Sequence, residues 1–238
     1  MTKVKALAKM IDHSILHPTF TDQDLVDGCN LAKEYDVASV CVKPYAVQQA
    51  AELLKGSEVE VGCVIGFPHG NSAPNVKVFE TEQAVKDGAT EIDMVVNNGK
   101  VLQDDWDYVE KEIAAVTEAC HKGGAIVKVI FETDFLPNDG YIVKLCEICT
   151  KVGADYVKTS SGFGFVKQPS GDYNYTGATI EHLNLMKKSI GPRVKVKAAG
   201  GVRTLDQLIE VQKTGASRCG ATATKVMLDE AIKRFGED

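Results

Sequence analysis

The sequence lacks a long apolar segment, an excess of positive charge and a leader-like start. No apolar run approaches the roughly 20 residues that a helix needs to cross a bilayer, so we expect no membrane-spanning segment. The N-terminal MTKVKALAKMIDHSI is interrupted by lysines and an aspartate, which argues against a signal peptide. The formal net charge of −6 argues against nucleic acid as the main partner.

The sequence also lacks the even, paired cysteines of a disulfide framework. Its seven cysteines are scattered, and most have apolar neighbours, as small core residues do. We therefore expect free thiols and a reducing, cytoplasmic setting. Cys146 and Cys149 form a CxxC, but they lie in a helical pattern with no second pair, so a structural role is favoured over a redox site.

Two glycine-rich nucleotide-binding motifs are absent. GxGxxG does not follow the first expected strand, and GxxxxGK[ST] occurs nowhere in the chain. Their absence counts against a doubly wound nucleotide-binding sheet. The chain of 238 residues, 44% of them hydrophobic and 25% charged, is still that of an ordinary soluble protein with a sizeable core.

Short β-branched segments alternate with helical patterns along the whole chain. The expected strands are 10–14, 39–43, 59–67, 91–96, 126–132, 156–160, 194–198 and 217–220, and segments such as 105–121 and 138–152 have helical spacing. Expected helix starts are Asp22, Asp104, Asn138, Thr179 and Thr204, and expected ends are Gly88, Gly123, Gly153 and Gly215. With no linker or shift in composition, the pattern predicts an α/β fold, a single-domain TIM (β/α)8 barrel over residues 1–238.

Two lysines lie in β-like segments that end in small residues and glycine, Lys158 in YVKTSSGF and Lys197 in VKVKAAGG. A buried cation is costly to desolvate, so it needs a partner or a chemical purpose. Two ammonium groups about 5 Å apart repel by about 3 kcal/mol at an effective dielectric constant of about 20. That repulsion lowers one pKa by about two units, which leaves free amine at neutral pH, as a Schiff-base nucleophile needs.

Other polar residues alternate with apolar ones on the expected strands. Glu91 and Asp93 share one face of the strand 91–96, and Lys128 alternates with valines. If these faces point inward, Asp93 could hold and relay the proton exchanged during amine catalysis. A purely structural ion-pair network of Lys128, Lys195 and Asp93 is equally well supported for the two lysines, since barrel interiors are normally apolar.

Glycine-bearing loops follow the last two expected strands. Gly200 and Gly201 precede the helix start at Thr204, and Gly220 precedes Thr222 and the last helix. Loops at this position, with a helix N-terminus, are the usual phosphate site of a TIM barrel, so together they favour a phosphorylated ligand.

The histidines give no comparable signal. His13 and His17 are four residues apart, but without the acidic residue of HExxH they make a poor zinc site. His69 follows the strand 59–67, where a plain turn is favoured over a place at the barrel mouth.

Seven stretches match one known family in order: IDHSILHP, SVCVKP, GFPHG, EIDMVVN, KVIFET, YVKTSSGF and KAAGGVRT. On these stretches, which span nearly the whole chain, the sequence resembles the deoxyribose-phosphate aldolases, class I aldolases with a TIM-barrel fold. The resemblance implies a carbon–carbon lyase of deoxyribonucleotide catabolism. It would cleave 2-deoxy-D-ribose 5-phosphate reversibly into acetaldehyde and D-glyceraldehyde 3-phosphate. It also implies no metal or organic cofactor, because lysine itself supplies the electron sink.

Carried over position by position, the resemblance makes Lys158 the Schiff-base lysine, Lys197 the second lysine that perturbs its pKa, and Asp93 the acid/base. The residues that it places around the substrate are Cys41, Gly162, Gly200, Gly201, Gly220 and Thr222. The implied partners are small phosphosugar and aldehyde substrates, not nucleic acid or a membrane, and family members are often dimers or larger.

Three features differ from the family pattern. The last glycine loop has Thr222 and Ala223 where serines are usual. The loop 162–177 is longer than usual and could bring Lys167 or Tyr173 to the phosphate or pack at a subunit interface. Some members end in a tyrosine-bearing tail, whereas the last tyrosine here is Tyr175.

Three other functions stay open at this point. One is a Schiff-base aldolase of a different aldehyde or sugar phosphate. Another is a TIM-barrel phosphosugar isomerase or epimerase, which would use carboxylate or histidine bases. The last is a non-enzymatic phosphosugar-binding barrel in which Lys158 only contacts an anion.

Overall fold

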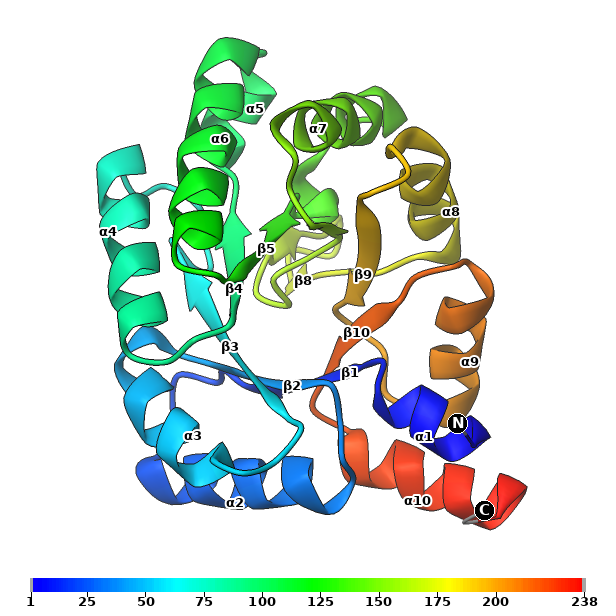
Figure 1. Cartoon of the computed structure of the whole chain (residues 1–238). Coiled ribbons are helices and arrows are strands. Elements are labelled where there is room, and N and C mark those ends of the chain that lie inside the picture. Colours follow the sequence, from blue (N-terminus) through cyan, green and yellow to red (C-terminus); the bar gives the residue numbers. More distant parts are fainter. Residues whose placement is uncertain (1, 237–238) are drawn as a thin grey trace.

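The computed structural model describes residues 2–236, and its centre is a closed barrel of parallel strands (Figure 1). The barrel strands are β1 (Ile11–Ile15), β2 (Ser39–Val42), β3 (Glu60–Ile65), β4 (Glu91–Val95), β5 (Ile126–Ile130), β6 (Tyr156–Lys158), β9 (Lys195–Ala199) and β10 (Arg218–Ala221). Each pairs with the next barrel strand in the chain, and β1 closes on β10. The predicted TIM barrel is confirmed, while Met1, Glu237 and Asp238 of the predicted domain lie outside the described residues.

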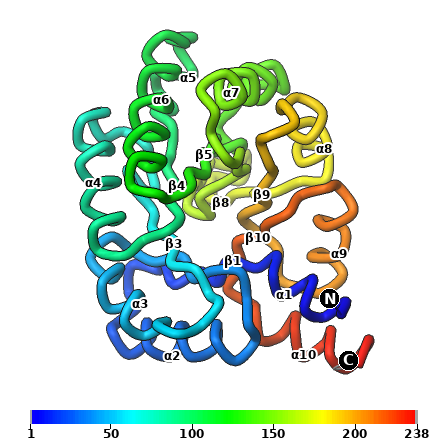
Figure 2. Tube along the Cα trace, viewed as in Figure 1, coloured from blue at the N-terminus to red at the C-terminus, as the bar shows by residue number. Residues whose placement is uncertain are grey.

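Helices surround the barrel, as the tube in Figure 2 also shows. They are α1 (Lys3–Ala8), α2 (Asp22–Glu34), α3 (Val47–Leu54), α4 (Pro74–Lys86), α5 (Asn98–Leu102), α6 (Trp106–Lys122), α7 (Asp139–Val152), α8 (Ile180–Ser189), α9 (Leu205–Lys213) and α10 (Thr224–Phe235). Two 3-10 turns, η1 (Pro44–Ala46) and η2 (Thr133–Phe135), follow β2 and β5. The order is that of a repeated βα unit.

Side-chain caps set most of the helix starts. Asn138, Thr179 and Thr204 are N-caps, as predicted, and each accepts a hydrogen bond from a backbone N–H of its helix. Asp22 is the first residue of α2, as predicted, and Thr21 caps it, whereas the predicted start Asp104 precedes the N-cap of α6, Asp105, by one residue. At the helix ends, Gly123 and Gly153 are C-caps as predicted. Gly88 and Gly215 follow their C-caps by one residue, both at positive φ.

Alternation along the strands separates two interiors. The outward residues of β4, Ile92 and Met94, are fully buried in the apolar layer between barrel and helices, while Asp93 between them faces the barrel axis among charged partners. The parallel strands are therefore buried on both faces. The predicted division of β4 into a polar inner face and an apolar outer face is confirmed.

The cysteines are all free thiols, and all are buried. Cys146 and Cys149 lie in α7 within the apolar core, where burial raises the pKa of Cys146 to about 12. The CxxC is therefore a pair of core residues, as predicted. Within residues 2–236, no helix is both long and apolar enough to traverse a bilayer.

A second buried ion pair lies between α4 and α6. Lys77 Nζ is 2.8 Å from Glu112 Oε1, and both side chains are fully buried. Lys77 also donates to the carbonyl oxygens of Gly70 and Val95, each at 2.7 Å. These bonds tie the GFPHG loop after β3 to the end of β4. His69 of that loop is exposed, as a turn residue would be.

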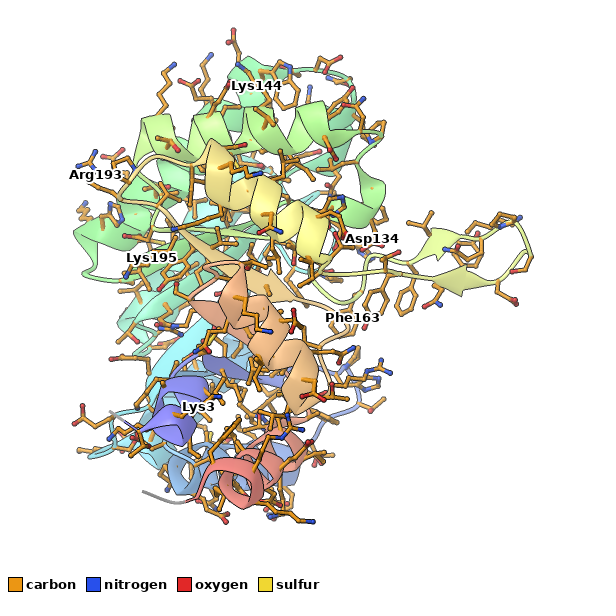
Figure 3. The ribbon with its side chains drawn as sticks, turned by 90° about the vertical axis from the view of Figure 1, so that its right-hand side faces the viewer. Lys3, Asp134, Lys144, Phe163, Arg193 and Lys195 are labelled. Carbon is orange, nitrogen blue, oxygen red and sulfur yellow. The ribbon has the colours of Figure 1, made fainter. Side chains whose placement is uncertain are left out.

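The long loop after β6 is a folded hairpin. Its strands β7 (Val166–Lys167) and β8 (Tyr173–Asn174) are antiparallel and form a sheet separate from the barrel. Figure 3 shows the hairpin extending from the side of the molecule that carries Asp134 and Phe163, opposite Arg193 and Lys195. Since Asp134 and Phe163 follow β5 and β6, the hairpin stands at the carboxyl ends of the strands.

Candidate active site

A column of charged side chains fills the barrel axis, where most TIM barrels carry valine, isoleucine and leucine. Its members are Asp12, Glu91, Asp93, Lys128, Lys158, Lys197 and Arg218. All are buried except the Arg218 side chain, which is 12% exposed at the amino ends of the strands. Charges this deep require partners, and each of them has at least one.

The lower part of the column joins Arg218 and Lys128 to two carboxylates. Arg218 forms ion pairs with Asp12 and Glu91. Lys128 Nζ donates to Asp12 Oδ2 at 2.9 Å and to Glu91 Oε2 at 2.6 Å, and it lies 3.1 Å from Asp93 Oδ1. These contacts place Lys128 in the ion-pair network, which was one of the two alternatives left open for it by the sequence.

The prediction that Lys195 joins this network is wrong. Lys195 is exposed at the first position of β9, on the side of the molecule opposite the hairpin (Figure 3). Its Nζ lies 5.6 Å from the centre of the Tyr156 ring. Lys195 shares a strand face with Lys197 but is one layer nearer the open lower end, where a long side chain can reach water. Arg218 on the neighbouring strand β10 occupies the place in the network instead.

The upper part of the column brings together Lys158, Lys197 and Asp93. Asp93 Oδ2 accepts hydrogen bonds from Lys158 Nζ at 2.6 Å and from Lys197 Nζ at 2.7 Å. Lys197 Nζ is also 2.5 Å from Asp12 Oδ2. One carboxylate oxygen thus lies between the two amines, and the second amine is linked through Asp12 to the lower network.

The lysines of the column differ in the direction of their pKa shifts. Burial lowers the pKa of Lys158, and the nearby ammonium of Lys197 adds to this, against the attraction of Asp93. Burial also disfavours the charged Lys197, but Asp12 and Asp93 outweigh it and raise its pKa. Burial would raise the pKa of Asp93, yet the ammonium groups of Lys128, Lys158 and Lys197 hold it well below its usual range. Lys197 therefore keeps its proton and Asp93 stays ionised.

The composition of the column explains why the pKa of Lys158 is lowered while the pKa values of Lys128 and Lys197 are raised. Four basic side chains meet three carboxylates, so one positive charge has no carboxylate of its own. Lys158 shares its partner, Asp93, with Lys197 and Lys128. If Lys158 is the neutral amine, the remaining charges are equal in number. Repulsion by Lys197 alone, as predicted from the sequence, is therefore only part of the cause, because burial contributes more.

A cavity of about 850 Å³ opens above Lys158 and Lys197 at the carboxyl ends of the strands. Its lining includes all the predicted substrate-binding residues, which are Cys41, Gly162, Gly200, Gly201, Gly220 and Thr222. One wall is the segment 16–20 after β1. Lys43 fixes that segment, because its Nζ donates to the carbonyl oxygens of His17 at 3.2 Å and of Phe20 at 3.0 Å. This size suits a small organic ligand.

Cys41 belongs to an apolar part of the cavity. It packs with Leu16 and Val64, and the rings of Phe67 and Phe163 cover this cluster. Burial raises the pKa of the Cys41 thiol to about 11, so it remains a neutral, small side chain at neutral pH.

The two glycine loops differ in the backbone groups that they can offer to an anion. At α9, Gln207 Oε1 accepts from the N–H groups of Arg203 at 2.8 Å and Thr204 at 3.1 Å, so the helix caps itself. At α10, the N-cap Ala223 supplies no side-chain hydrogen bond, and Thr222 beside it is exposed in the cavity. The start of α10 is therefore the better anion site of the two helix ends.

Sequence reasoning missed four residues of this region. Asp12 alternates with apolar residues on β1, a signal that was available in the stretch IDHS. Glu132, with φ of 55°, accepts hydrogen bonds from the Ser161 N–H and hydroxyl and so fixes the chain after Lys158. Arg203 and Tyr175 also line the cavity. No periodic pattern marks Glu132, Arg203 or Tyr175, because all three lie outside regular strands and helices.

Comparison with known proteins gives a consistent result. The sequence model of the DeoC/LacD family aldolases matches residues 6–225. The deoxyribose-phosphate aldolase of Rhodopirellula baltica is 49% identical over 230 residues, which are 97% of this chain and 91% of the relative. That of Clostridium perfringens is 48% identical over 218 residues, with 92% of each chain covered.

Solved structures agree with these sequence matches. A putative deoxyribose-phosphate aldolase from Coccidioides immitis has a TM-score of 0.88 at 38% identity, covering 96% of this chain and 87% of the other. The tetrameric deoxyribose phosphate aldolase from Aeropyrum pernix has a TM-score of 0.85 at 27% identity, covering 98% and 93%. In both comparisons the match includes almost the whole barrel.

Proposed function

The chain belongs to the DeoC/LacD family of aldolases, and we propose that Lys158 is the amine that forms the Schiff base in its reaction. The reaction is the reversible cleavage of 2-deoxy-D-ribose 5-phosphate into acetaldehyde and D-glyceraldehyde 3-phosphate. One observation carries the proposal for Lys158: it lines the cavity, and it is the lysine of the charged column whose pKa is lowered, because burial outweighs the attraction of Asp93. A neutral amine is the form that attacks an aldehyde.

The steps follow from the position of this amine. Lys158 Nζ attacks the aldehyde carbon C1 of the open-chain sugar, and loss of water from the carbinolamine leaves an iminium ion. Lys197, neutral once it has given its proton to the carbinolamine hydroxyl, takes the proton of the C3 hydroxyl. The C2–C3 bond breaks, its electron pair forms the C1–C2 double bond of an enamine, and the π pair of the iminium moves to the Lys158 nitrogen. Glyceraldehyde 3-phosphate leaves at this point. Lys197 then protonates C2. Hydrolysis of the iminium, with one proton returned to Lys197, releases acetaldehyde and restores the free amine.

We propose that Lys197 and Asp93 transfer the protons of the reaction. Lys197 is held protonated, and its Nζ shares Asp93 Oδ2 with the Lys158 amine. When Lys197 gives a proton to the departing water, the new iminium charge on Lys158 replaces the charge that Lys197 loses. The total charge of the column is then unchanged during the step. Asp93 acts as the relay between the two nitrogens rather than as a resting acid, because its pKa is held so low.

The same geometry weighs against the other functions considered for the sequence. An isomerase or epimerase with a carboxylate base is disfavoured, because the neighbouring cations hold the pKa of Asp12 and of Asp93 well below the usual range and so make both weak bases. A binding protein that used Lys158 as an anion contact would need it protonated, whereas burial favours the neutral amine. The aldolase assignment is supported over both.

Two further properties belong to this proposal. The tetrameric relative from Aeropyrum pernix supports a homo-oligomeric state for this chain, which light scattering would measure. The buried free thiols support a reducing, cytoplasmic location.

Borohydride trapping tests the assignment of Lys158. Acetaldehyde and sodium borohydride together should convert Lys158 to its N-ethyl derivative, identified by peptide mass spectrometry. The Lys158→Met variant should give no adduct in the barrel, whereas Lys195→Met, which removes an exposed lysine of the neighbouring strand, should trap acetaldehyde as the wild type does. A folded protein without an adduct on Lys158 would contradict the proposal.

A further inference from the structure

The hairpin β7–β8 contributes to the catalytic cavity through residues other than those expected. Phe165, Asn174 and Tyr175 line the same cavity as Lys158. Lys167 and Tyr173, which the sequence offered as phosphate contacts, pair with each other in the hairpin, and Tyr173 is 66% exposed. The prediction for these two residues is therefore wrong. The physical reason is position along the hairpin: Tyr173 lies within β8, away from the barrel, whereas Tyr175 follows the end of β8 and lies next to the residues that bond to the barrel mouth.

The second leg of the hairpin is fixed to the barrel just after Tyr175. Asp134 of η2 accepts hydrogen bonds from the N–H groups of Thr176 at 2.5 Å and Gly177 at 2.9 Å. The Ala178 N–H donates to the carbonyl oxygen of Gly200 at 3.1 Å. Residues 176–178, directly after Tyr175, are thus held by two parts of the barrel mouth, η2 and the loop after β9.

The ring of Tyr175 lies against the glycine loop after β9. A methyl group on Gly200 would be 3.4 Å from Tyr175 Cε2 and 3.0 Å from Gly177 Cα, so the two segments are in contact there. Cε2 adjoins the ring carbon that bears the hydroxyl. Across the hairpin, Phe165 meets the Tyr175 ring edge to face, with the ring centres 5.4 Å apart. These contacts orient a phenol at the Gly200 loop, on the wall of the cavity that also contains the start of α10.

The Tyr175 hydroxyl is available to a ligand. Within residues 2–236, no protein group forms a hydrogen bond with the Tyr175 hydroxyl, and the one bond of this residue to a side chain joins its N–H to Asn174 Oδ1 at 2.9 Å. Arg203, which follows the same glycine loop, also lines the cavity, and no carboxylate of the described chain pairs with its guanidinium. A phenol and a guanidinium at one end of a cavity match the acceptor oxygens of a phosphate.

We propose that Tyr175 is a specificity-determining residue whose hydroxyl donates a hydrogen bond to the phosphate of the substrate. The hairpin holds this hydroxyl at the Gly200 loop, and Phe165 is a positioning residue that fixes the ring. The proposal rests on the proposed function, because it takes deoxyribose 5-phosphate as the substrate. A contact to the phosphate, remote from the bond that breaks, is the same in ground state and transition state. It therefore changes KM and leaves kcat unaltered.

The Tyr175→Phe variant isolates the hydroxyl. It keeps the ring, its contact with Phe165 and the backbone bonds to Asp134, so the fold is preserved. We expect KM for deoxyribose 5-phosphate to rise about tenfold, the usual effect of losing a hydrogen bond to a charged group, with kcat unchanged. KM for unphosphorylated deoxyribose should not change. Tyr173→Phe, at the exposed end of the hairpin, is the matched control and should behave as the wild type does.

Two results would overturn the proposal. One is an unchanged KM for deoxyribose 5-phosphate in Tyr175→Phe. The other is an equal rise for the phosphorylated and unphosphorylated sugars, which would give the ring a general packing role. Acetaldehyde trapping separates this test from that of the proposed function, because acetaldehyde carries no phosphate. If wild type and Tyr175→Phe both form the Lys158 adduct while KM is unchanged, the Tyr175 proposal alone fails.

Discussion

The floor and the rim of the catalytic cavity differ in the interactions that hold them together. The floor is the charged column, in which buried side chains from six barrel strands contact one another directly. The rim is a hairpin outside the barrel sheet, with one aromatic pair across its own two legs, and backbone N–H groups join it to Asp134 and to the carbonyl oxygen of Gly200. Charges in the floor act on one another across a region of low dielectric, whereas groups on the rim are screened by water.

This difference assigns chemistry to one region and substrate selection to the other. A substitution in the floor should change the protonation of Lys158 and therefore kcat, even where the altered residue never meets the substrate. A substitution in the rim should change only the affinity for one part of the substrate. The following variants, ordered from the largest expected effect to the smallest, test that separation.

Lys197→Leu should have the largest effect. Without Lys197, the column has three basic groups for three carboxylates, so Lys158 keeps its proton beside Asp93. The proton donor for carbinolamine dehydration is lost as well. We expect kcat at neutral pH to fall by a factor of about a hundred or more, with the circular dichroism spectrum of the wild type. Undiminished activity at neutral pH would show that the floor does not control the amine.

Phe165→Ala should have the smallest effect. It removes the edge-to-face contact with Tyr175 but leaves the Asp134 bonds, so the phenol samples more orientations. We expect KM for deoxyribose 5-phosphate to rise by a factor of about three, from the 0.5–1.5 kcal/mol that such a pair is worth, with kcat unchanged. Phe165→Tyr, which keeps a ring there, should restore the wild-type KM. A fall in kcat in either variant would erase the distinction between rim and floor.

The floor was largely predictable from sequence because strand alternation is a local property. It placed Lys158, Lys197 and Asp93 on inward faces, and the order of the strands placed them at one end of the barrel. Alternation does not give depth along the axis, which is why Lys195 was assigned to a network that it does not join. Nor does it pair strands far apart in the chain, so the contacts of Asp12 on β1 with Arg218 on β10 were missed.

The rim was not predictable for a different reason. The length of the loop 162–177 was evident, but a hairpin of two-residue strands has no periodic signal of its own. Its register depends on turn geometry and on the anchors Asp134 and Gly200, which are distant in sequence. A choice between Tyr173 and Tyr175 therefore required the structure.

The central claim is that burial in the charged column lowers the pKa of Lys158, so that it releases its proton more readily than the other lysines of the column. It is tested most directly by the pH dependence of acetaldehyde trapping at Lys158, measured in the wild type and in Arg218→Met. Free amine increases as pH rises through the pKa, and burial lowers that pKa, so the wild-type rate should reach its midpoint below the usual value of 10.5.

Arg218→Met removes one positive charge at the far end of the column, where Arg218 pairs with Asp12 and Glu91. Asp12 and Glu91 then attract Lys128 and Lys197 more strongly. Asp93 is left with more of its negative charge to stabilise the protonated form of Lys158. The account predicts a midpoint about one unit higher, and so about tenfold slower trapping below the midpoint, in a protein with the wild-type fold. A wild-type midpoint near 10.5, or the same midpoint in both proteins, would contradict it.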